Sequence, residues 1–238
     1  MTGTLLNVVT VLLGAALGVL LGSRFPERMR QTVMAGLGIM VLIVGVSMAI
    51  PGNALIVLFS LLIGGILGEL IDVDGKLNAL GRWLEARFAR EGDAGNFTKG
   101  FLTASLVFCV GPMTILGSIQ DGLVGDYRLL AVKSLLDLFA ALAFASTLGI
   151  GVAFAAVTVL LVQGGIALVA ILIGASLGMP ESDTLWIIQM TATGGAVILG
   201  ISFLLLEIKQ VRVANFIPAI LIAPLIQVAL EYFKIQLP

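Results

Sequence analysis

The chain has 238 residues, of which 59% are hydrophobic and 29 are glycine, whereas hydrophobic residues and glycine together make up about 45–50% of a soluble domain. Charged residues are only 11%, histidine is absent and cysteine occurs once. Disulfide frameworks and histidine-based zinc sites or proton relays are therefore excluded. Because so much of the chain is apolar, we expect it to be surrounded by lipid. The formal net charge is only −1, so we expect no nucleic-acid partner.

The apolar residues form runs that are long enough to cross a bilayer. A helix needs about 20 apolar residues to span the hydrocarbon core. We therefore predict an all-α bundle of about eight transmembrane spans, which forms a single integral membrane domain over residues 1–238. The predicted spans are residues 4–23, 32–50, 53–71, 98–119, 128–149, 151–177, 183–206 and 213–233. No basic residue precedes the first run, so we expect a retained span rather than a cleaved signal.

The basic residues divide unevenly among the loops between these runs. With both termini outside, most of the 13 Lys and Arg residues fall at the cytoplasmic ends, as the positive-inside rule predicts. These residues are Arg24, Arg28, Arg30, Lys76, Arg82, Arg87, Arg90, Lys99, Lys209 and Arg212. A seven-span arrangement would place Lys209 and Arg212 outside, so eight spans fit better.

Glycines recur every four residues in several spans. Gly14, Gly18 and Gly22 lie on one face of the first span, and the pairs Gly64/Gly68 and Gly174/Gly178 repeat the pattern. Small residues at this spacing let helix backbones approach closely in lipid. The stripes predict either tight packing within one subunit or a homodimer through the glycine-rich faces.

The longest loop, residues 72–97, carries a helical pattern. Its apolar residues Leu77, Leu80, Leu84 and Phe88 recur at helical spacing, with charged residues on the other faces. We predict an amphipathic helix over residues 75–91 that lies on the cytoplasmic membrane surface. A helix that docks a partner is the alternative. Glu69 and Asp72, just before this loop, are expected to be interfacial.

The fourth span contains an expected break at Gly111-Pro112. Proline removes a backbone donor and clashes with the preceding turn, and a break at membrane depth is tolerated only inside protein or beside a wet cavity. The polar residues that follow are Thr114, Ser118, Gln120 and Asp121. Hydroxyls, a carboxylate and freed carbonyls are ligands that suit a monovalent or divalent cation, without identifying the metal. A simple proline kink is the alternative.

The fifth span carries Lys133-Ser134-Leu135-Leu136-Asp137. Lys133 and Asp137 are four residues apart, so they share a helix face and can pair. Ionisable residues inside a span are costly and are functional candidates by default. One interpretation is a self-neutralised pair. The other is that Asp137 and Ser134 line a polar path or cation site, with Lys133 as counter-charge or gate.

The later spans add further polar or irregular positions. Gln163 lies in the sixth span, and Asn215 precedes Pro218 and Pro224 in the eighth, which we expect to be broken. The segments Val8–Leu13 and Ile43–Ser47 resemble Ala156–Leu161 and Ile198–Ser202, each five spans further on. Because five is an odd number, the second copy of each segment would cross the membrane in the opposite direction to the first. Spans one to three and six to eight would then form an inverted repeat, as in secondary transporters.

Several motifs carry a resemblance to a known family. They are Gly3-Thr4-Leu5-Leu6-Asn7, Gly64-Gly65-Ile66-Leu67-Gly68-Glu69, Phe108-Cys109-Val110-Gly111-Pro112-Met113, Gln120-Asp121-Gly122 and Arg212-Val213-Ala214-Asn215. In their order and spacing they resemble the YqgA/YdfK-type family of bacterial inner-membrane proteins, which carries a domain of unknown function. The resemblance covers nearly the whole chain and implies a multi-pass protein of the bacterial inner membrane. It implies no activity.

These features favour a transporter or channel for an ion or small solute. The residues predicted to line its path are Gly111, Pro112, Thr114, Ser118, Gln120, Asp121, Lys133, Ser134, Asp137, Gln163 and Asn215. No cofactor is predicted apart from a cation held by these oxygens. A membrane scaffold or sensor subunit is the alternative. An intramembrane aspartyl protease using Asp121 or Asp126 with Asp137 has the wrong motif spacing, so we expect a protein that is not an enzyme.

Overall fold

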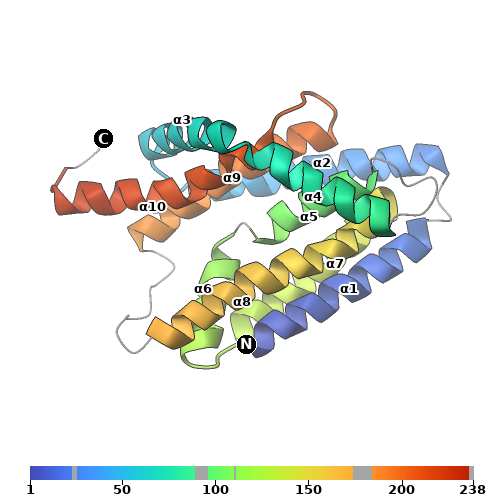
Figure 1. Ribbon diagram of the computed structural model, residues 1–238, viewed down its shortest axis with the longest axis horizontal. Helices are drawn as coiled ribbons and strands as arrows, with labels where there is room; N and C mark the ends of the chain where they lie inside the picture. The colour runs from blue at the N-terminus through green and yellow to red at the C-terminus, as the bar shows by residue number, and fades with distance from the viewer. Residues whose placement is uncertain (23–25, 89–95, 110, 174–183, 236–238) are drawn as a thin grey trace. The chain divides into compact units, whose positions relative to one another are not determined.

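The computed structural model describes residues 1–22, 26–88, 96–109, 111–173 and 184–235, and all regular elements in these ranges are helices (Figure 1). The elements are α1 (Thr2–Gly22), α2 (Glu27–Ala49), α3 (Ala54–Ile71), α4 (Val73–Phe88), α5 (Asn96–Cys109), α6 (Pro112–Leu123), α7 (Arg128–Leu148), η1 (Gly149–Phe154), α8 (Ala155–Ile173), α9 (Leu185–Leu205), η2 (Val213–Phe216) and α10 (Ile217–Tyr232). The predicted all-α class is confirmed.

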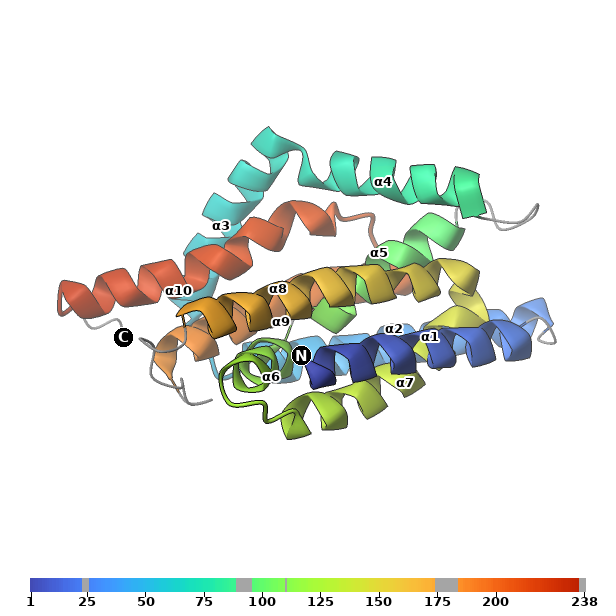
Figure 2. The same ribbon diagram turned by 60° about the horizontal axis from the view of Figure 1, so that its bottom comes forward.

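Six stretches of the described chain are long and apolar enough to cross a membrane, and the bent pair α5–α6 makes a seventh if it counts as one span. One of the six, Arg128–Leu172, contains α7 and α8, which are 21 and 19 residues long. Figure 2 shows α8 running back along the direction of α7. Taken helix by helix, these elements coincide with the eight predicted runs.

The reversal between α7 and α8 depends on a glycine. Gly149 ends α7 with φ 78°, and its N–H donates to the carbonyl of Ala145. Residues with a side chain rarely adopt this left-handed conformation, whereas glycine does so without steric cost. The 3₁₀ turn η1 follows and leads into α8. The divide that the sequence predicted at residues 149–151 is confirmed.

The described chain forms two compact units, each assembled from separated segments. Unit 1 comprises Met1–Met34 and Asn78–Pro180, and unit 2 comprises Ala35–Leu77 and Glu181–Pro238. Unit 1 therefore holds α1, α5, α6, α7 and α8, and unit 2 holds α3, α9, α10 and most of α2. That the whole chain acts as one membrane domain stays a prediction.

In unit 1, α1 packs against α7 through its glycine stripe. A Cβ atom at Gly14, Gly18 or Gly22 would clash with the carbonyl oxygen of Leu138, Leu142 or Ser146, respectively. The partners advance together along the two helices, so α1 and α7 are parallel. This is the packing within one subunit that the stripe predicted, and a homodimer through the same face would have to displace α7. Gly174 and Gly178 lie outside the described residues.

The interrupted pair α5–α6 runs the length of α8 in unit 1. At one end a Cβ atom on Gly151 would meet the backbone of Phe97, and at the other a Cβ atom on Gly122 would meet that of Ala167. The pair is bent by 62°. A re-entrant loop would return to the end at which it started, whereas α5–α6 finishes at the opposite end. The segment therefore behaves as one broken span.

In unit 2, two antiparallel helix pairs form the core. Gly45 of α2 and Gly195 of α9 pack against each other's carbonyl oxygens, and Gly64 and Gly68 of α3 pack against Ala219 and Asn215. The eighth predicted span starts irregularly, with η2 before α10 and Pro218 in the first turn of α10. A missing N–H is harmless there. Pro224 lies inside α10 and does not end it, so the break expected in the eighth span is limited to its irregular start at η2.

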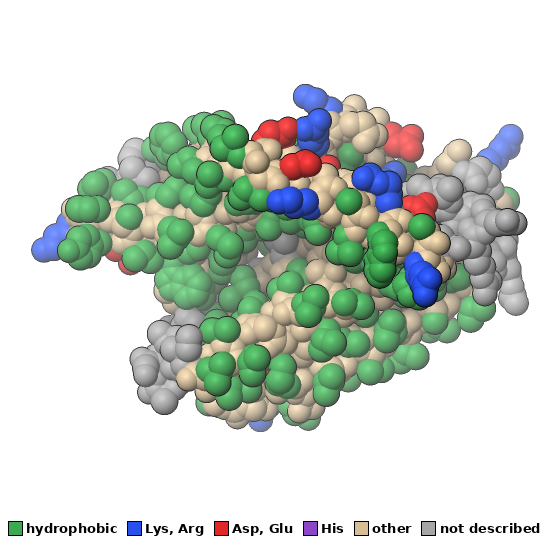
Figure 3. Space-filling model, viewed as in Figure 1, with side chains coloured by type: hydrophobic (Ala, Val, Ile, Leu, Met, Phe, Trp, Pro, Cys, Tyr) green, Lys and Arg blue, Asp and Glu red, His purple; other side chains and the backbone are tan. Residues whose placement is uncertain are grey.

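The predicted amphipathic segment forms α4 as far as Phe88, and residues 89–91 lie outside the described part of the chain. Its Trp83 is 62% exposed. Figure 3 shows charged side chains over α4, whereas hydrophobic side chains dominate the visible face over α1 and α8. Large apolar surfaces of this kind need lipid rather than water around them, so the bilayer contact of the spans follows. The placement of α4 on the membrane surface stays a prediction.

Candidate functional site

Unit 1 contains a layer of buried polar side chains contributed by four helices. Each of these residues, taken with its backbone, is at most 7% exposed, and we call this set the polar layer. Its members are Thr4 and Asn7 of α1, Thr114 and Ser118 of α6, Lys133, Ser134 and Asp137 of α7, and Gln163 of α8. Six of these eight residues were predicted from the sequence. Thr4 and Asn7 were not.

The charges of the polar layer are the ion pair that the sequence predicted. The ammonium of Lys133 donates to Oδ2 of Asp137, and the two side chains are only 8% and 10% exposed. Since α7 starts at Arg128 and has 21 residues, Asp137 lies close to its middle, about 13 Å from its start. A charge pair at that depth is costly unless further hydrogen bonds satisfy it.

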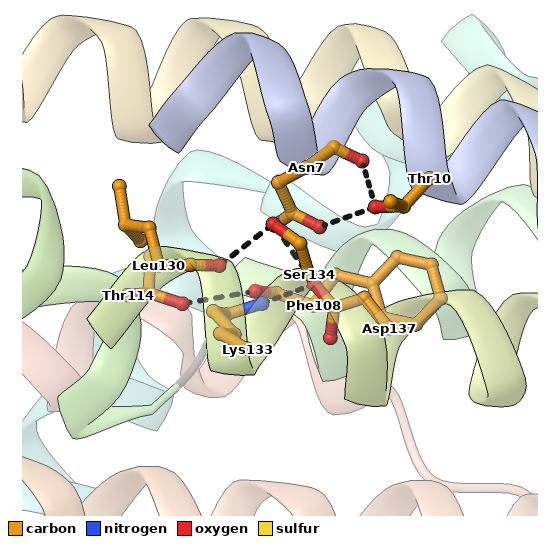
Figure 4. Close-up of polar contacts among 8 residues, drawn as sticks. All are labelled: Asn7, Thr10, Phe108, Thr114, Leu130, Lys133, Ser134 and Asp137. Atoms are coloured by element: carbon orange, nitrogen blue, oxygen red, sulfur yellow. Dashed lines mark hydrogen bonds and ion pairs between the residues drawn. The ribbon is translucent and has the colours of Figure 1, made fainter. Parts of the chain in front are cut away.

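A further hydrogen bond to the carboxylate of Asp137 comes from α1. Nδ2 of the fully buried Asn7 donates to Oδ2 of Asp137 over 2.9 Å. The hydroxyl of Thr10 donates to the carbonyl oxygen of Asn7, also over 2.9 Å. Figure 4 shows Asn7 and Thr10 on α1 facing Asp137 across the two parallel helices. The close approach at the glycine stripe brings these groups within reach.

The helix break supplies a second polar element. In an unbroken helix the N–H of residue 112 would donate to the carbonyl of Phe108, but proline has no N–H. The hydroxyl of Thr114 donates to that carbonyl instead, over 3.0 Å. The carbonyl of Gly111 accepts the N–H groups of Thr114 and Ile115 at 3.2 and 3.4 Å. The chain therefore ends one helix and starts another at Pro112.

The break faces the ion pair. The ring centroid of Phe108 lies 6.3 Å from that of Phe144, and Gly117 packs against Leu130. Phe108 and Gly117 therefore contact α7 on either side of Asp137, which lies about two turns from both Leu130 and Phe144. The break at Pro112 thus lies at the same depth as Asp137. Figure 4 shows Phe108 and Thr114 close to Lys133. The structure thus brings Thr114, Lys133 and Asp137 together.

Three other members of the polar layer have hydrogen-bonding capacity to spare. The hydroxyls of Thr4 and Ser118 and both amide atoms of Gln163 are buried without a hydrogen-bond partner among the described residues. Gly122 packs against Ala167, and Ser118 on α6 and Gln163 on α8 each lie about one turn before this contact. Thr4 lies next to Gly164. Such groups cost free energy in lipid and are suited to hold a hydrogen-bonding ligand.

Three further predicted residues have other surroundings or structural partners. The carboxylate of Asp121 is 3% exposed and accepts the N–H of Gly3 over 3.0 Å and the amino group of Met1 over 3.1 Å, so it holds the start of α1. The hydroxyl of Ser134 donates to the carbonyl of Leu130 over 2.6 Å, in its own helix. Gln120 is half-buried.

Asn215 does not belong to the polar layer, because it lies in unit 2. Its Nδ2 donates to Oε2 of Glu69 over 2.6 Å, and its Oδ1 accepts the N–H of Asp74 over 2.7 Å. Arg212 also pairs with Glu69. This network ties the end of α3 and the start of α4 to η2. From the sequence Glu69 was expected only to be interfacial, although Glu69 and Asn215 both stand in the motifs that carry the family resemblance.

The carboxylates of the described chain do not gather into a metal site. Within the described ranges, no group of three or more Asp, Glu or Cys residues lies close enough to hold a metal ion. Asp137 is the single carboxylate of the polar layer, and Lys133 already neutralises it. The arrangement is better suited to a monovalent ion or a small solute than to a divalent cation, which prefers several carboxylates.

Comparison with known proteins gives a family but no activity. Residues 2–228 match the family model described as "Protein of unknown function (DUF554)". The chain is 30% identical to the "Uncharacterized membrane protein YdfK" of Bacillus subtilis (strain 168) over 241 residues, which cover 99% of this chain and 100% of that protein. It is 29% identical to the "Uncharacterized protein YqgA" of Escherichia coli (strain K12), over 93% of this chain and 94% of that protein. No solved structure matches.

Proposed function

The chain belongs to the DUF554 family of proteins of unknown function, and we propose that it is a transporter or channel for an ion or small solute. The observation that carries this proposal is the Lys133–Asp137 pair, buried at the middle of α7 and opposite a broken span. Both features cost free energy in a bilayer. A protein that only had to sit in the membrane would need neither.

The path would run through the polar layer. Asp137 would receive the substrate cation or solute, while Lys133 acts as the counter-charge that keeps the site neutral between transport events. A cation that reaches Asp137 must compete with Lys133 for the carboxylate. The unpaired groups of Ser118 and Gln163 would replace water around the substrate. Asn7 would hold Asp137 in place.

The helix arrangement supports an inverted repeat of spans one to three and six to eight. A two-fold axis in the membrane plane makes each pair of related helices antiparallel. The pairs α2 and α9, and α3 and α10, are antiparallel, as their glycine contacts indicate. The pair α1 and α8 is antiparallel because α1 runs parallel to α7 and α8 runs back along α7. Within unit 1, a two-fold axis of this kind would exchange the parallel pair α1–α7 with α8 and the segment α5–α6. Such repeats are typical of secondary transporters, whose sites lie near the midplane on discontinuous helices.

We propose the bacterial inner membrane as its location because its relatives are bacterial and one is named a membrane protein. The distribution of its Lys and Arg residues favours an orientation with both termini outside. The surroundings of Asp121 and Asp137 favour a role other than that of an aspartyl protease. Asp137 is paired with Lys133, and Asp121 is bonded to the start of α1. An aspartyl protease needs two carboxylates that share one proton, and these two have separate partners.

Reconstitution of the purified chain into liposomes tests the proposal. Osmotic swelling would report uptake of small solutes, and entrapped dyes would report entry of H⁺, Na⁺ or K⁺. We expect protein-dependent flux in at least one of these assays and its loss in Asp137→Asn. Absence of flux across the whole panel would contradict the proposal.

A second variant separates transport from folding. Replacing a buried ion pair by apolar residues of similar size is often neutral for stability or raises it. Asn7 donates to the same carboxylate, so it has to be replaced together with the pair. The triple variant Asn7→Leu/Lys133→Met/Asp137→Leu should therefore unfold at the temperature of the parent chain or above it, and yet show no flux. Normal flux in this variant would rule out a role for the pair in transport.

A further inference from the structure

Unit 2 contains a cavity of about 680 Å³ that the transport proposal does not use. It lies at one end of the unit, where α3 and α9 begin and α10 ends. With the predicted orientation this is the outer end. The volume is in the range of small-molecule sites. Asn53, Gln189 and Gln227 line it with amides, and Glu231 and Lys234 line it with opposite charges.

Two of the amides are buried and have spare capacity. Gln189 is 5% exposed, and its Oε1 accepts the backbone N–H of Asn53 over 2.8 Å. Gln227 is 8% exposed, and its Nε2 donates to Oε1 of Glu231 over 2.8 Å. Within the described chain, the amide nitrogen of Gln189 and the amide oxygen of Gln227 make no hydrogen bond. The cavity therefore offers one uncharged donor and one uncharged acceptor.

The two charges at the cavity are close in sequence but do not pair with each other. Among the described residues no ion pair joins Glu231 to Lys234. Lys234 has φ 54°, in the left-handed region, and its N–H donates to the carbonyl of Glu231 over 3.1 Å as α10 ends. This turn places both side chains on the wall of the same cavity. Each charge is available to a ligand.

Apolar side chains complete the lining of the cavity. Ile56 and Leu230 line the cavity beside the charged residues. One turn further into the unit, Ser60 follows Ile56 on α3 and Thr193 follows Gln189 on α9. Both hydroxyls are fully buried and have no hydrogen-bond partner among the described residues. These two hydroxyls lie behind the lining residues and are not part of the cavity wall.

We propose that this cavity binds a small zwitterion. Lys234 would receive the anionic group, Glu231 would receive the ammonium group, and Ile56 and Leu230 would cover an apolar substituent. A ligand with a single charge could pair with only one of these two exposed side chains, whereas a zwitterion can pair with both. The inference concerns binding in unit 2 and does not rest on transport through unit 1.

Equilibrium binding to the purified full-length chain tests the proposal, with L-leucine as the probe. Leucinamide lacks the carboxylate and 4-methylpentanoate lacks the ammonium group, so we expect both to bind about tenfold more weakly or worse. Lys234→Gln and Glu231→Gln should each weaken L-leucine binding about tenfold. Lys209→Gln, at the opposite end of unit 2, is the matched control and should leave binding unchanged. Equal binding of all three probes would overturn the proposal.

The same chemistry is present in a phosphatidylethanolamine headgroup. Native mass spectrometry of the chain with phosphatidylethanolamine or phosphatidylcholine separates this source from a free solute. Selective retention of phosphatidylethanolamine, lost in Glu231→Gln, would support a lipid zwitterion. Binding of L-leucine alone would support a free one. If neither probe binds, the cavity is not a zwitterion site, whatever the outcome of the flux assays.

Discussion

Asn7 of α1 donates a hydrogen bond of 2.9 Å to Asp137 of α7, across 130 residues of chain. The contact joins two parallel helices and shares its acceptor oxygen with Lys133. The ion pair therefore depends on a neutral amide in the first span. Helix α1 is thus part of the polar layer, because it supplies this donor.

Replacing Asn7 by Leu should destabilise the chain by about 1–3 kcal/mol, because a buried carboxylate loses one of its two donors. Thermal unfolding in detergent measures the effect. Thr10→Ala is the matched control on the same helix: it removes only a half-buried hydroxyl and should cost less than about 1 kcal/mol. Equal effects of the two variants would contradict the role assigned to Asn7.

The glycine stripe allows a second comparison within unit 1. Gly18→Ala places a methyl group against the carbonyl of Leu142, and we expect a loss of about 1–3 kcal/mol from overpacking. Gly165→Ala adds the same group on α8 with no described atom within 4 Å. That variant should be neutral or stabilising by about 0.5–1 kcal/mol, because alanine favours a helix more than glycine does. A stabilising Gly18→Ala would show that α1 and α7 do not pack in this register.

At the break in the fourth span, Thr114→Val should cost about 1–3 kcal/mol, since it leaves the carbonyl of Phe108 without a donor. Thr114→Ser keeps the hydroxyl and should cost less. Pro112→Ala restores the backbone N–H, so Thr114→Val should cost less in that background. A double-mutant cycle from unfolding measurements gives this coupling. If the free-energy changes of Pro112→Ala and Thr114→Val simply add, the Thr114 hydroxyl does not replace the missing N–H of residue 112.

The network around Glu69 in unit 2 leads to a ranking of two variants. The Arg212–Glu69 pair is exposed, at 67% and 57% of the two side chains, so Arg212→Gln should cost less than about 1 kcal/mol. Asn215 is 2% exposed and bonds both Glu69 and the backbone of Asp74. Asn215→Ala should therefore cost about 1–3 kcal/mol. Unfolding temperatures give the order, and the reverse order would refute it.

The helices and the break were predictable because they depend on local properties of the chain. Run length predicts a span, Pro112 removes one specific donor, and the four-residue spacing of Lys133 and Asp137 places them on one face. Each of these features is present in the structure. The position of Asp137 near the middle of its helix also followed from counting along the run.

The partners of these residues could not be predicted, because they depend on which helix faces meet. Asn7 is one of several polar residues in apolar runs, and only the parallel register of α1 and α7 brings it to Asp137. Asn215 was predicted to line the same transport path as Asp137 because it precedes Pro218 in the irregular start of the eighth span. The structure instead bonds it to Glu69 in unit 2, since composition indicates depth in the membrane but not the neighbouring helix.

That the buried polar layer opens to water during transport is the central claim of the proposed function, and it can be measured without knowing the substrate. In a Cys109→Ala background, Ser118→Cys and Gln163→Cys place a thiol in the layer, and Leu161→Cys places one on the surface of α8, where Leu161 is 69% exposed. Sealed vesicles are treated with a charged, membrane-impermeant thiosulfonate reagent. We predict modification at residues 118 and 163 but not at 161, because a thiol facing lipid does not ionise. Protection of both polar-layer cysteines from either side of the membrane would contradict the account.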